Sequence, residues 1–240
     1  MKQNSKNKLT ESYGGEFFRE KKGATIKSAK VIAPIVLDIL KSKSIVDVGC
    51  GEGEFLKVFS ELGVRDFIGI DGPWVDKTRL EIPEKNFRMH NLEESLNLNR
   101  KFDLVISLEV AEHLRPEKSK MFVKQLTKLG DNILFSAAIP FQGGTSHLNE
   151  QWQDYWANLF KKEGYVPMDY IRSKIWNNPE VAFWYSQNML LYVKNNNKFQ
   201  QAEFINVVHP KLYTAKMEFY NKMKRLFLPV KWFLSIFRAK

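Results

Sequence analysis

A glycine-rich turn between a buried strand and a helix constrains the fold of this chain most strongly. Residues 44–55 read SIVDVGCGEGEF, so an apolar, β-branched run leads into Gly49, Gly51 and Gly53. Glycine adopts backbone conformations closed to other residues and lets a ligand approach the main chain, while the helix that follows offers free N–H groups. A tight strand-to-helix turn and a ligand-binding loop both fit this pattern.

An acidic residue on the next predicted strand favours the ligand-binding interpretation. Asp71 ends the run FIGID about 20 residues after the glycines, where a carboxylate can accept both hydroxyls of a ribose. The spacing differs from the GxGxxG of dinucleotide-binding proteins, and no Gly-Lys-Ser/Thr follows as a phosphate loop requires. We therefore expect a nucleoside to bind without a pyrophosphate clamp.

Strand-like and helical segments alternate over residues 31–193, which predicts a doubly wound, mostly parallel α/β sheet with an antiparallel last strand. Predicted strands cover residues 44–48, 67–71, 86–90, 102–107, 133–137 and 187–193. Predicted helices cover residues 28–40, 54–62, 116–129 and 150–162. A strand within residues 166–175 would pair with the last strand at one edge, and Gly63, Gly130 and Gly164 would be left-handed helix ends.

Charge divides the chain into a near-neutral centre and two basic ends. Of the formal charge of +10, residues 1–30 contribute +5, residues 31–197 contribute −2 and residues 198–240 contribute +7. We predict a basic arm over 1–30, in which Tyr13, Phe17 and Phe18 form a lid or a simple anchor, and a central domain over 31–193. A linker over 194–210 would lead to a tail over 211–240. The near-neutral centre argues against a nucleic-acid-binding core.

The tail interleaves lysines and arginines with large apolar side chains. This composition is typical of an amphipathic helix in a membrane surface, here kinked at Pro229, and predicts peripheral contact with the inner face of the membrane. A helix that docks on its own domain or on a partner subunit is an equal alternative, and an RNA-binding tail is a third. The sequence leaves the oligomeric state undetermined.

The cysteine count and the hydropathy indicate the compartment. Cys50 is the single cysteine, so a disulfide scaffold and a cysteine zinc site are both excluded. No stretch reaches the roughly 20 apolar residues that a spanning helix needs, and the polar N-terminus does not resemble a signal peptide. We expect a cytoplasmic protein.

Three ordered motifs, VDVGCGEGEF, GIDG and FDLVISLEVAEHL, resemble those of class I S-adenosylmethionine-dependent methyltransferases. The resemblance covers most of residues 25–193 and implies a Rossmann-like fold with S-adenosylmethionine as cofactor. It implies that the methionine part is wrapped by Asp47, Gly49, Cys50, Gly51 and Gly53, and that Asp71 holds the ribose. The other implied cofactor contacts are Gly72, Trp74, Asn91, Leu92, Ser107, Leu108 and Glu109.

Three of these residues have alternative interpretations. Trp74 fits a plain core position as well as one beside the adenine. Asn91 stands where the family often has an aspartate near the adenine amino group. Cys50 needs no thiol chemistry and is interpreted as a small packing residue.

Glu109, Glu112 and His113 form an E-x-x-E-H pattern after the fourth strand, and one turn of helix there would bring all three to one side. Two carboxylates and an imidazole suit Mg²⁺ or Mn²⁺. The pattern resembles metal-dependent O-methyltransferases of the ubiquinone pathway and others that act on the 3′ ends of small RNAs. The latter resemblance implies a further histidine after the fifth strand, where this chain has His147.

Two other interpretations of this segment stay open. In a metal-free site, His113 or His147 would be the general base and Glu109 would lie where cofactor and acceptor meet. In a purely structural interpretation, Glu112 caps a helix and His113 is packed in the interior.

Aromatic residues gather in two segments beside the predicted ligand-binding edge of the sheet. They suit sugar rings, planar acceptors or bases, although residues 152–160 also fit the core face of a helix. Resemblance to a bacterial branch of the family implies O-methyl transfer to a glycan, nucleotide-sugar or related cell-envelope precursor. The alternatives are a metal-dependent RNA 2′-O-methyltransferase and a non-catalytic cofactor-binding module. The aromatic residues are Phe141, Trp152, Tyr155, Trp156, Trp176, Phe183, Trp184 and Tyr185.

Overall fold

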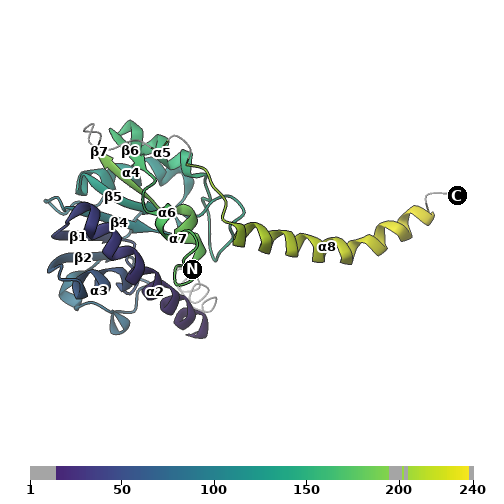
Figure 1. Ribbon diagram of the computed structural model, residues 1–240, viewed down its shortest axis with the longest axis horizontal. Coiled ribbons are helices and arrows are strands. Elements are labelled where there is room, and N and C mark those ends of the chain that lie inside the picture. The colour runs from purple at the N-terminus through teal and green to yellow at the C-terminus, as the bar shows by residue number, and fades with distance from the viewer. Residues whose placement is uncertain (1–14, 195–201, 203–204, 238–240) are drawn as a thin grey trace, which may run out of the picture. The chain divides into compact units, whose positions relative to one another are not determined.

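The structure, a computed structural model, describes residues 15–194, 202 and 205–237. Two compact units divide the chain, residues 1–207 and residues 208–240. The first contains a seven-stranded sheet with the strand order β3-β2-β1-β4-β5-β7-β6 (Figure 1). The pairs are parallel except those of β7, which is antiparallel to both β5 and β6. The predicted fold class is confirmed.

The strands of the first unit are β1 (Ser44–Val48), β2 (Asp66–Asp71), β3 (Phe87–Met89), β4 (Leu104–Leu108), β5 (Asn132–Ser136), β6 (Tyr165–Met168) and β7 (Leu190–Lys194). Its helices are α2 (Gly15–Leu40), α3 (Glu54–Glu61), α4 (Ser119–Leu129), α5 (Gln153–Lys162), α6 (Arg172–Ile175) and α7 (Phe183–Asn188). A short 3₁₀ turn, η3 (Ala111–His113), follows β4. The second unit contains α8 (Pro210–Phe237).

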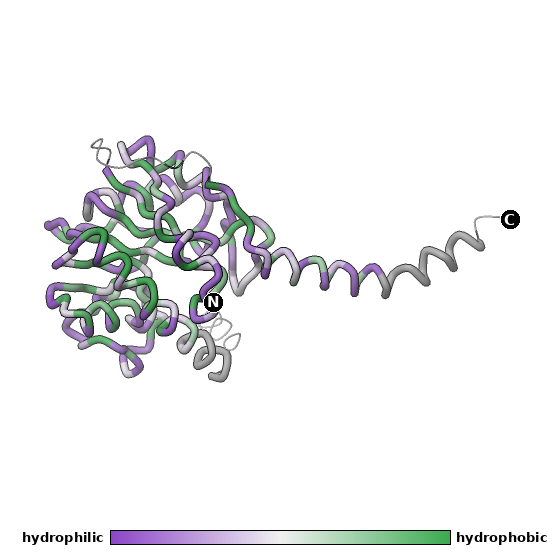
Figure 2. The backbone as a smooth tube through the Cα atoms, viewed as in Figure 1, coloured by the Kyte–Doolittle hydropathy of each residue, from purple (hydrophilic) through white to green (hydrophobic). Residues whose placement is uncertain are grey.

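Helices cover both faces of the sheet because its strands are apolar on both sides. Ile45 of β1 packs into one cluster with residues of α2, α3, α6 and α7, whereas its neighbour Val46 packs into another with residues of α4 and α5. This alternation is the period of two that a strand imposes. Figure 2 shows the apolar strands running through the centre of the first unit. The result is a three-layer α/β/α unit.

The strand order indicates where in the sheet a ligand would bind. The chain proceeds from β1 outward to β2 and β3, then returns to pair β4 with the other side of β1. Connections from β1 and β4 therefore leave toward opposite sides, and in open α/β sheets ligands bind at the carboxyl ends of strands at such a switch point. The glycine turn follows β1 here, and the E-x-x-E-H segment follows β4.

Several predicted boundaries need correction. Gln187 and Asn188 were expected at the start of a strand, but they end helix α7, and β7 begins at Leu190. The strand expected within 166–175 ends at Met168, because residues 172–175 form α6. The aromatic and amide residues before β7 have high strand or turn preference, and tertiary packing overrides it.

Gly63 and Gly164 have the expected left-handed conformation, with φ of 100° and 85°. Gly130 does not, because its φ of −177° is extended. A Cβ at Gly130 would lie 2.6 Å from the carbonyl oxygen of Phe102, so close backbone approach explains this glycine.

The predicted arm and tail are described in part. Helix α2 runs through residue 30 without a break. The structure does not describe residues 1–14, which include Tyr13, or the side chains of Phe17 and Phe18. The tail is helical from Pro210 to Phe237, and the side chains from residue 225 onward are not described. Among the described helices, none has the length and apolarity needed to cross a membrane.

Candidate active site

The loop between β1 and α3 adopts a conformation that requires glycine. Gly49, Gly51 and Gly53 have φ of 88°, 57° and 95°. A Cβ at Gly49 would overlap the side chain of Val110, and one at Gly53 would lie 2.9 Å from Ile82. The bare backbone of the loop thus packs directly on the segment that follows β4. This contact joins the glycine loop to the E-x-x-E-H segment.

Asp71 fastens the same loop to the end of β2. Its buried carboxylate accepts hydrogen bonds from the backbone N–H groups of Gly51 at 2.7 Å and Gly72 at 2.6 Å. Burial raises the pKa of Asp71, and the bonds from the two amides oppose that rise. A carboxylate fixed in this position can accept ribose hydroxyls.

A second acid, Asp47, lies beside the loop at the end of β1. It is 4% exposed, and burial raises its pKa well above the usual range, with the charges of Asp71 and Glu54 adding to the effect. Several carboxylates around one glycine loop create a negative environment, which a positively charged ligand would relieve. S-adenosylmethionine carries such charges on its amino group and its sulfonium, so the residues present fit this cofactor.

The other predicted cofactor contacts differ in their surroundings. Cys50 is buried, and its Sγ would be 2.7 Å from a Cβ at Gly69, so it packs the turn against β2. Trp74 is 63% exposed and lies over Gly72, which is inconsistent with a core position. Ser107 and Leu108 are buried at the end of β4.

Asn91 and Leu92 follow β3, and their side chains have local partners. The Asn91 side chain accepts a bond from the backbone N–H of Glu93 at 3.1 Å and donates one to the Glu94 carboxylate at 2.9 Å. Leu92 is 2% exposed and packs in the core. Asn91 would have to give up these bonds in order to bind an adenine.

Three of the four residues predicted to bind a metal come together. Glu112, His113 and His147 each offer a ligand atom, and these atoms all lie within 4.8 Å of one another. Within the described part of the chain this is the one such group of acidic, histidine and cysteine side chains. Glu112 is 1% exposed, and the two imidazole rings meet edge to face with centroids 4.9 Å apart.

Neighbouring groups hold both imidazoles through Nδ1. The Nδ1 atom of His113 lies 3.3 Å from the carbonyl oxygen of Ser146, and that of His147 lies 2.9 Å from a carboxylate oxygen of Glu150. Glu150 also accepts backbone bonds from Phe141 at 2.7 Å and Gly143 at 2.8 Å, so it organises the whole loop. Metal-binding histidines are commonly oriented in this way, with Nε2 as the ligand atom.

Glu109 lies outside this group. Its φ of 55° turns the chain immediately after β4, and the 3₁₀ geometry of η3 replaces the expected turn of α-helix. Its carboxylate instead accepts hydrogen bonds from Asn188 at 3.1 Å and Gln142 at 3.0 Å. Asn188 was not predicted as a site residue because α7 was expected to be a turn and the start of a strand, and the role of Glu150 was not predicted either.

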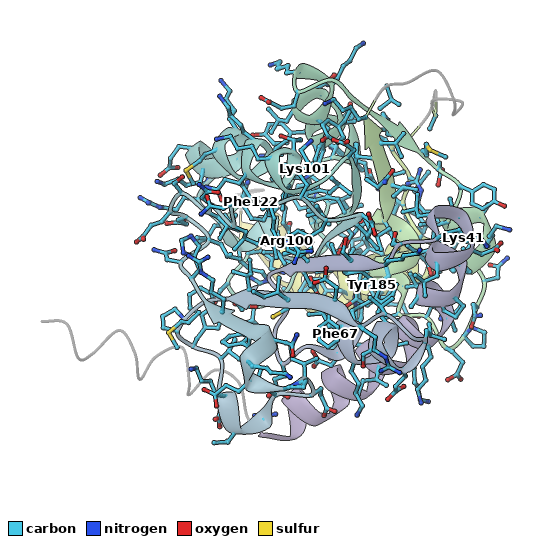
Figure 3. All side chains as sticks on the ribbon, turned by 90° about the vertical axis from the view of Figure 1, so that its left-hand side faces the viewer. Lys41, Phe67, Arg100, Lys101, Phe122 and Tyr185 are labelled. Carbon is cyan, nitrogen blue, oxygen red and sulfur yellow. The ribbon has the colours of Figure 1, made fainter. Side chains whose placement is uncertain are left out.

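The aromatic residues range from buried to exposed, and four of them are half-buried: Tyr155, Trp176, Phe183 and Trp184. Trp156 and Tyr185 are buried, and Tyr185, labelled in Figure 3, packs edge-on against Phe55 of α3 at 5.5 Å. Phe141 and Trp152, on the loop after β5, are 83% and 41% exposed. The loop that carries His147 therefore also presents apolar surface.

A family model described as "Methyltransferase domain" matches residues 25–172, more than half of the chain. The chain belongs to the class I S-adenosylmethionine-dependent methyltransferases. Residues 25–172 extend from α2 to the start of α6, so this match includes the glycine loop, Asp71 and the Glu112–His113–His147 cluster. S-adenosylmethionine is accordingly the cofactor of this methyltransferase fold.

Two curated relatives align with part of this methyltransferase. Protein 235L of Invertebrate iridescent virus 6, provisionally named a methyltransferase, is 26% identical over an alignment of 141 residues, and the match covers 56% of this chain and 52% of the viral protein. The mitochondrial ubiquinone biosynthesis O-methyltransferase of Dictyostelium discoideum is 29% identical over an alignment of 116 residues, and the match covers 40% of this chain and 36% of the relative. The chain thus spans about half the length of the curated relatives it matches, or less.

A solved structure shares the fold. Magnesium protoporphyrin IX methyltransferase from Synechocystis PCC 6803, determined with bound S-adenosylhomocysteine (SAH), has a TM-score of 0.51 and 19% sequence identity. The superposition covers 72% of this methyltransferase and 84% of that chain. This similarity supports the fold.

Proposed function

We propose that this methyltransferase transfers the methyl group of S-adenosylmethionine to a hydroxyl oxygen of a small acceptor, with a divalent cation held by Glu112, His113 and His147. The observation that carries the proposal is the convergence of these three side chains within 4.8 Å. They lie on the segments that follow β4 and β5, and Val110 of the first segment touches the glycine loop. An acceptor beside the cluster would therefore be close to the cofactor.

The donor set fits a divalent transition-metal ion better than Mg²⁺. One carboxylate and two imidazoles leave coordination positions open, and of the two ions expected from the sequence this set favours Mn²⁺, because Mg²⁺ prefers oxygen ligands alone. When bound, the ion would lower the pKa of a coordinated hydroxyl and so favour its attack on the methyl group. Glu150 and the Ser146 carbonyl would keep the two rings in the orientation that a ligand needs.

The chain's own residues would position the cofactor. Asp71 would accept the ribose hydroxyls, while Asp47 and the backbone of Gly49 and Gly51 would surround the methionine part. Transfer from a sulfonium needs mainly alignment, because the leaving group is already activated. Because a Cβ at Gly49 would overlap Val110, the two segments are closely packed, and this packing would set the distance between the cofactor loop and the proposed acceptor side.

For the acceptor we propose a glycan, nucleotide-sugar or related envelope precursor. The exposed Phe141 and Trp152 would supply apolar faces against a ring. The name of the Dictyostelium relative, an O-methyltransferase, supports oxygen as the methylated atom. An RNA 2′-hydroxyl is disfavoured by the charge of −2 over residues 31–197.

For α8 we propose peripheral contact with an anionic membrane surface on the inner face. Its described side chains include exposed Tyr213, Phe219 and Tyr220 beside the exposed Lys216 and Lys222. Sedimentation with anionic and with neutral vesicles tests the proposal. Binding to anionic vesicles that persists after deletion of residues 211–240 would contradict it.

The activity test supplies S-adenosylmethionine labelled in its methyl group together with hydroxyl acceptors of three classes: nucleotide-sugars, catechols and short RNA. We expect transfer to an oxygen that a strong chelator stops and Mn²⁺ restores. Glu112→Gln should abolish transfer, whereas Glu117→Gln, a matched change at an exposed glutamate of the same segment, should not. Full activity in chelator would instead favour His113 or His147 as a metal-free general base. Cofactor binding without turnover on any acceptor would favour a non-catalytic module.

A further inference from the structure

Glu109 has surroundings that set it apart from the cation cluster. We propose that Asn188 and Gln142 are positioning residues, which hold the Glu109 carboxylate at the acceptor side of the site as a second, separate acid. The inference rests on the proposed O-methyl transfer, in which the acceptor hydroxyl must lose a proton. Neither amide residue lies in the motifs that predicted the cofactor and metal sites.

The backbone at Glu109 first indicates a functional position. A φ of 55° is unfavourable for any residue with a Cβ, and the cost is of the order of 1 kcal/mol or more. Glycine would relieve this cost, yet a glutamate is present at the end of the central strand β4. Its N–H donates to the carbonyl and hydroxyl oxygens of Ser136 at 3.0 and 3.1 Å, which fixes the turn.

Amides from two distant segments then fix the side chain. Asn188 Nδ2, at the end of α7, lies 3.1 and 3.4 Å from the two carboxylate oxygens of Glu109, and Gln142 Nε2 donates at 3.0 Å. Asn188 Nδ2 also lies 2.9 Å from Gln142 Oε1, so the two amides are bonded to each other. None of these four hydrogen bonds involves Glu112, His113 or His147.

Gln187 and Arg172 extend this network into the core. Gln187 Nε2 donates to Gln142 Oε1 at 2.9 Å and to Asn188 Oδ1 at 3.0 Å, and its own carbonyl accepts from the buried Arg172 at 3.1 Å. Asn188 is 3% exposed and Gln187 is fully buried. The side-chain amides of Asn188, Gln142 and Gln187 therefore hydrogen-bond to Glu109 or to one another, and this network holds the Glu109 carboxylate in place.

Opposing influences act on the pKa of Glu109. Burial raises the pKa of Glu109, while the bonds from Asn188, Ser136 and Gln142 and the charge of His147 lower it. Tyr185 of α7 also interacts with Glu109: burial is the main cause that raises the pKa of Tyr185, and the charge of Glu109 adds to it. The bonds from the two amides stabilise the ionised carboxylate and so oppose the effect of burial on its pKa.

In the proposed step the acceptor O–H bond breaks and its proton passes to the Glu109 carboxylate. The oxygen forms a bond to the methyl carbon as the carbon–sulfur bond breaks. The electron pair of that bond stays on sulfur, which leaves as neutral S-adenosylhomocysteine. Atoms and charge balance without any further reactant.

The test measures the Glu109 carboxyl directly, in the full chain and without an acceptor. Glutamate labelled with ¹³C at the carboxyl carbon gives one NMR signal per residue, and the signal missing from Glu109→Gln identifies Glu109. Gln142→Ala, on a partly exposed loop, and Asn188→Ala should each raise the titration midpoint by about one pH unit, a tenfold change in proton affinity. Asn132→Ala is the matched control. The Asn132 amide donates to the Asp103 carbonyl at the start of β5, away from Glu109, so this change should leave the midpoint unchanged. Repeating the titration in His147→Ala removes the influence of that imidazole.

A midpoint that neither Gln142→Ala nor Asn188→Ala moves would overturn the inference. Where an acceptor is methylated, the acidic limb of kcat/KM should shift upward with the NMR midpoint while the affinity for S-adenosylhomocysteine stays the same. A merely structural role would lower activity at every pH without this shift. Because the titration needs no turnover, it separates failure of this inference from failure of the proposed function.

Discussion

The carboxylate of Asp71 accepts a hydrogen bond of 2.7 Å from the backbone N–H of Gly51, 20 residues earlier in the chain. One end of this bond belongs to the cofactor loop after β1 and the other to the acid at the end of β2. The bond couples the shape of the loop to the residue that receives the ribose, so a change at either end should affect the other.

Replacing Asp71 tests this coupling. Asp71→Asn keeps the shape of the side chain but removes the negative charge that accepts hydrogen bonds from the N–H groups of Gly51 and Gly72. A hydrogen bond to a charged group contributes about 1.5–3 kcal/mol, so we expect about 10-fold to 150-fold weaker binding of S-adenosylhomocysteine by calorimetry. Asp76→Asn, which changes an exposed acid that caps a short 3₁₀ turn, is the control. Equal losses in both variants would contradict the coupling.

Gly49→Ala should destabilise the protein as well as weaken cofactor binding. The new Cβ would overlap Val110, and the φ of 88° is strained for alanine, so we expect a loss of about 2 kcal/mol in the free energy of unfolding. Gly23→Ala makes the same change in helix α2, where nothing lies within 4 Å of the new Cβ. That control should gain about 0.5–1 kcal/mol. Urea unfolding of both variants provides the comparison, and equal effects would refute the steric argument.

Asp47 should make stability depend on pH. Its pKa is raised in the folded protein, so the folded state favours the protonated acid, and stability falls as pH rises through that raised pKa. Asp47→Asn, which cannot ionise, should therefore be more stable than the wild type at neutral pH, and the difference should shrink toward pH 4. Unfolding in urea at several pH values, without cofactor, measures this. A constant difference across the range would show that burial of the charge is not the cause.

The parts of the site that follow the carboxyl ends of predicted strands were predictable. The glycine turn and Asp71 follow from strand patterning and from the conformational freedom of glycine, and the approach of His147 to Glu112 and His113 was expected from a family resemblance. Each depends on which segments follow the carboxyl ends of β1, β2, β4 and β5.

The contacts of Glu109 were not predictable from its spacing. Helical periodicity would place it with Glu112 and His113, but its left-handed backbone and the 3₁₀ turn after it direct it elsewhere. Its partner Asn188 comes from α7, a short helix whose aromatic sequence resembles a strand or a turn. Long-range packing decides that segment, and local preference carries no information about it.

Arg172 should be important for stability although it is remote from the cofactor loop. Its guanidinium is 2% exposed and bonds the Asp169 carboxylate at 2.7 and 2.6 Å and the carbonyl of Ile205 at 2.8 Å. Arg172→Ala would leave these acceptors without a donor, at a cost of about 3–5 kcal/mol. Lys174→Ala, at an exposed position of the same helix, should change stability by less than about 0.5 kcal/mol. Thermal unfolding distinguishes the two, and similar midpoints would contradict the anchoring role.

The central claim is that Glu112, His113 and His147 hold a divalent cation where the acceptor oxygen binds. Electron paramagnetic resonance of Mn²⁺, titrated into the full chain with S-adenosylhomocysteine present, tests it without knowledge of the acceptor. We predict one bound Mn²⁺ per chain, weakened at least about tenfold in Glu112→Gln and in His147→Ala and unchanged in Glu117→Gln. Equal Mn²⁺ affinity in the wild type and all three variants, or no binding to the wild type, would contradict the claim.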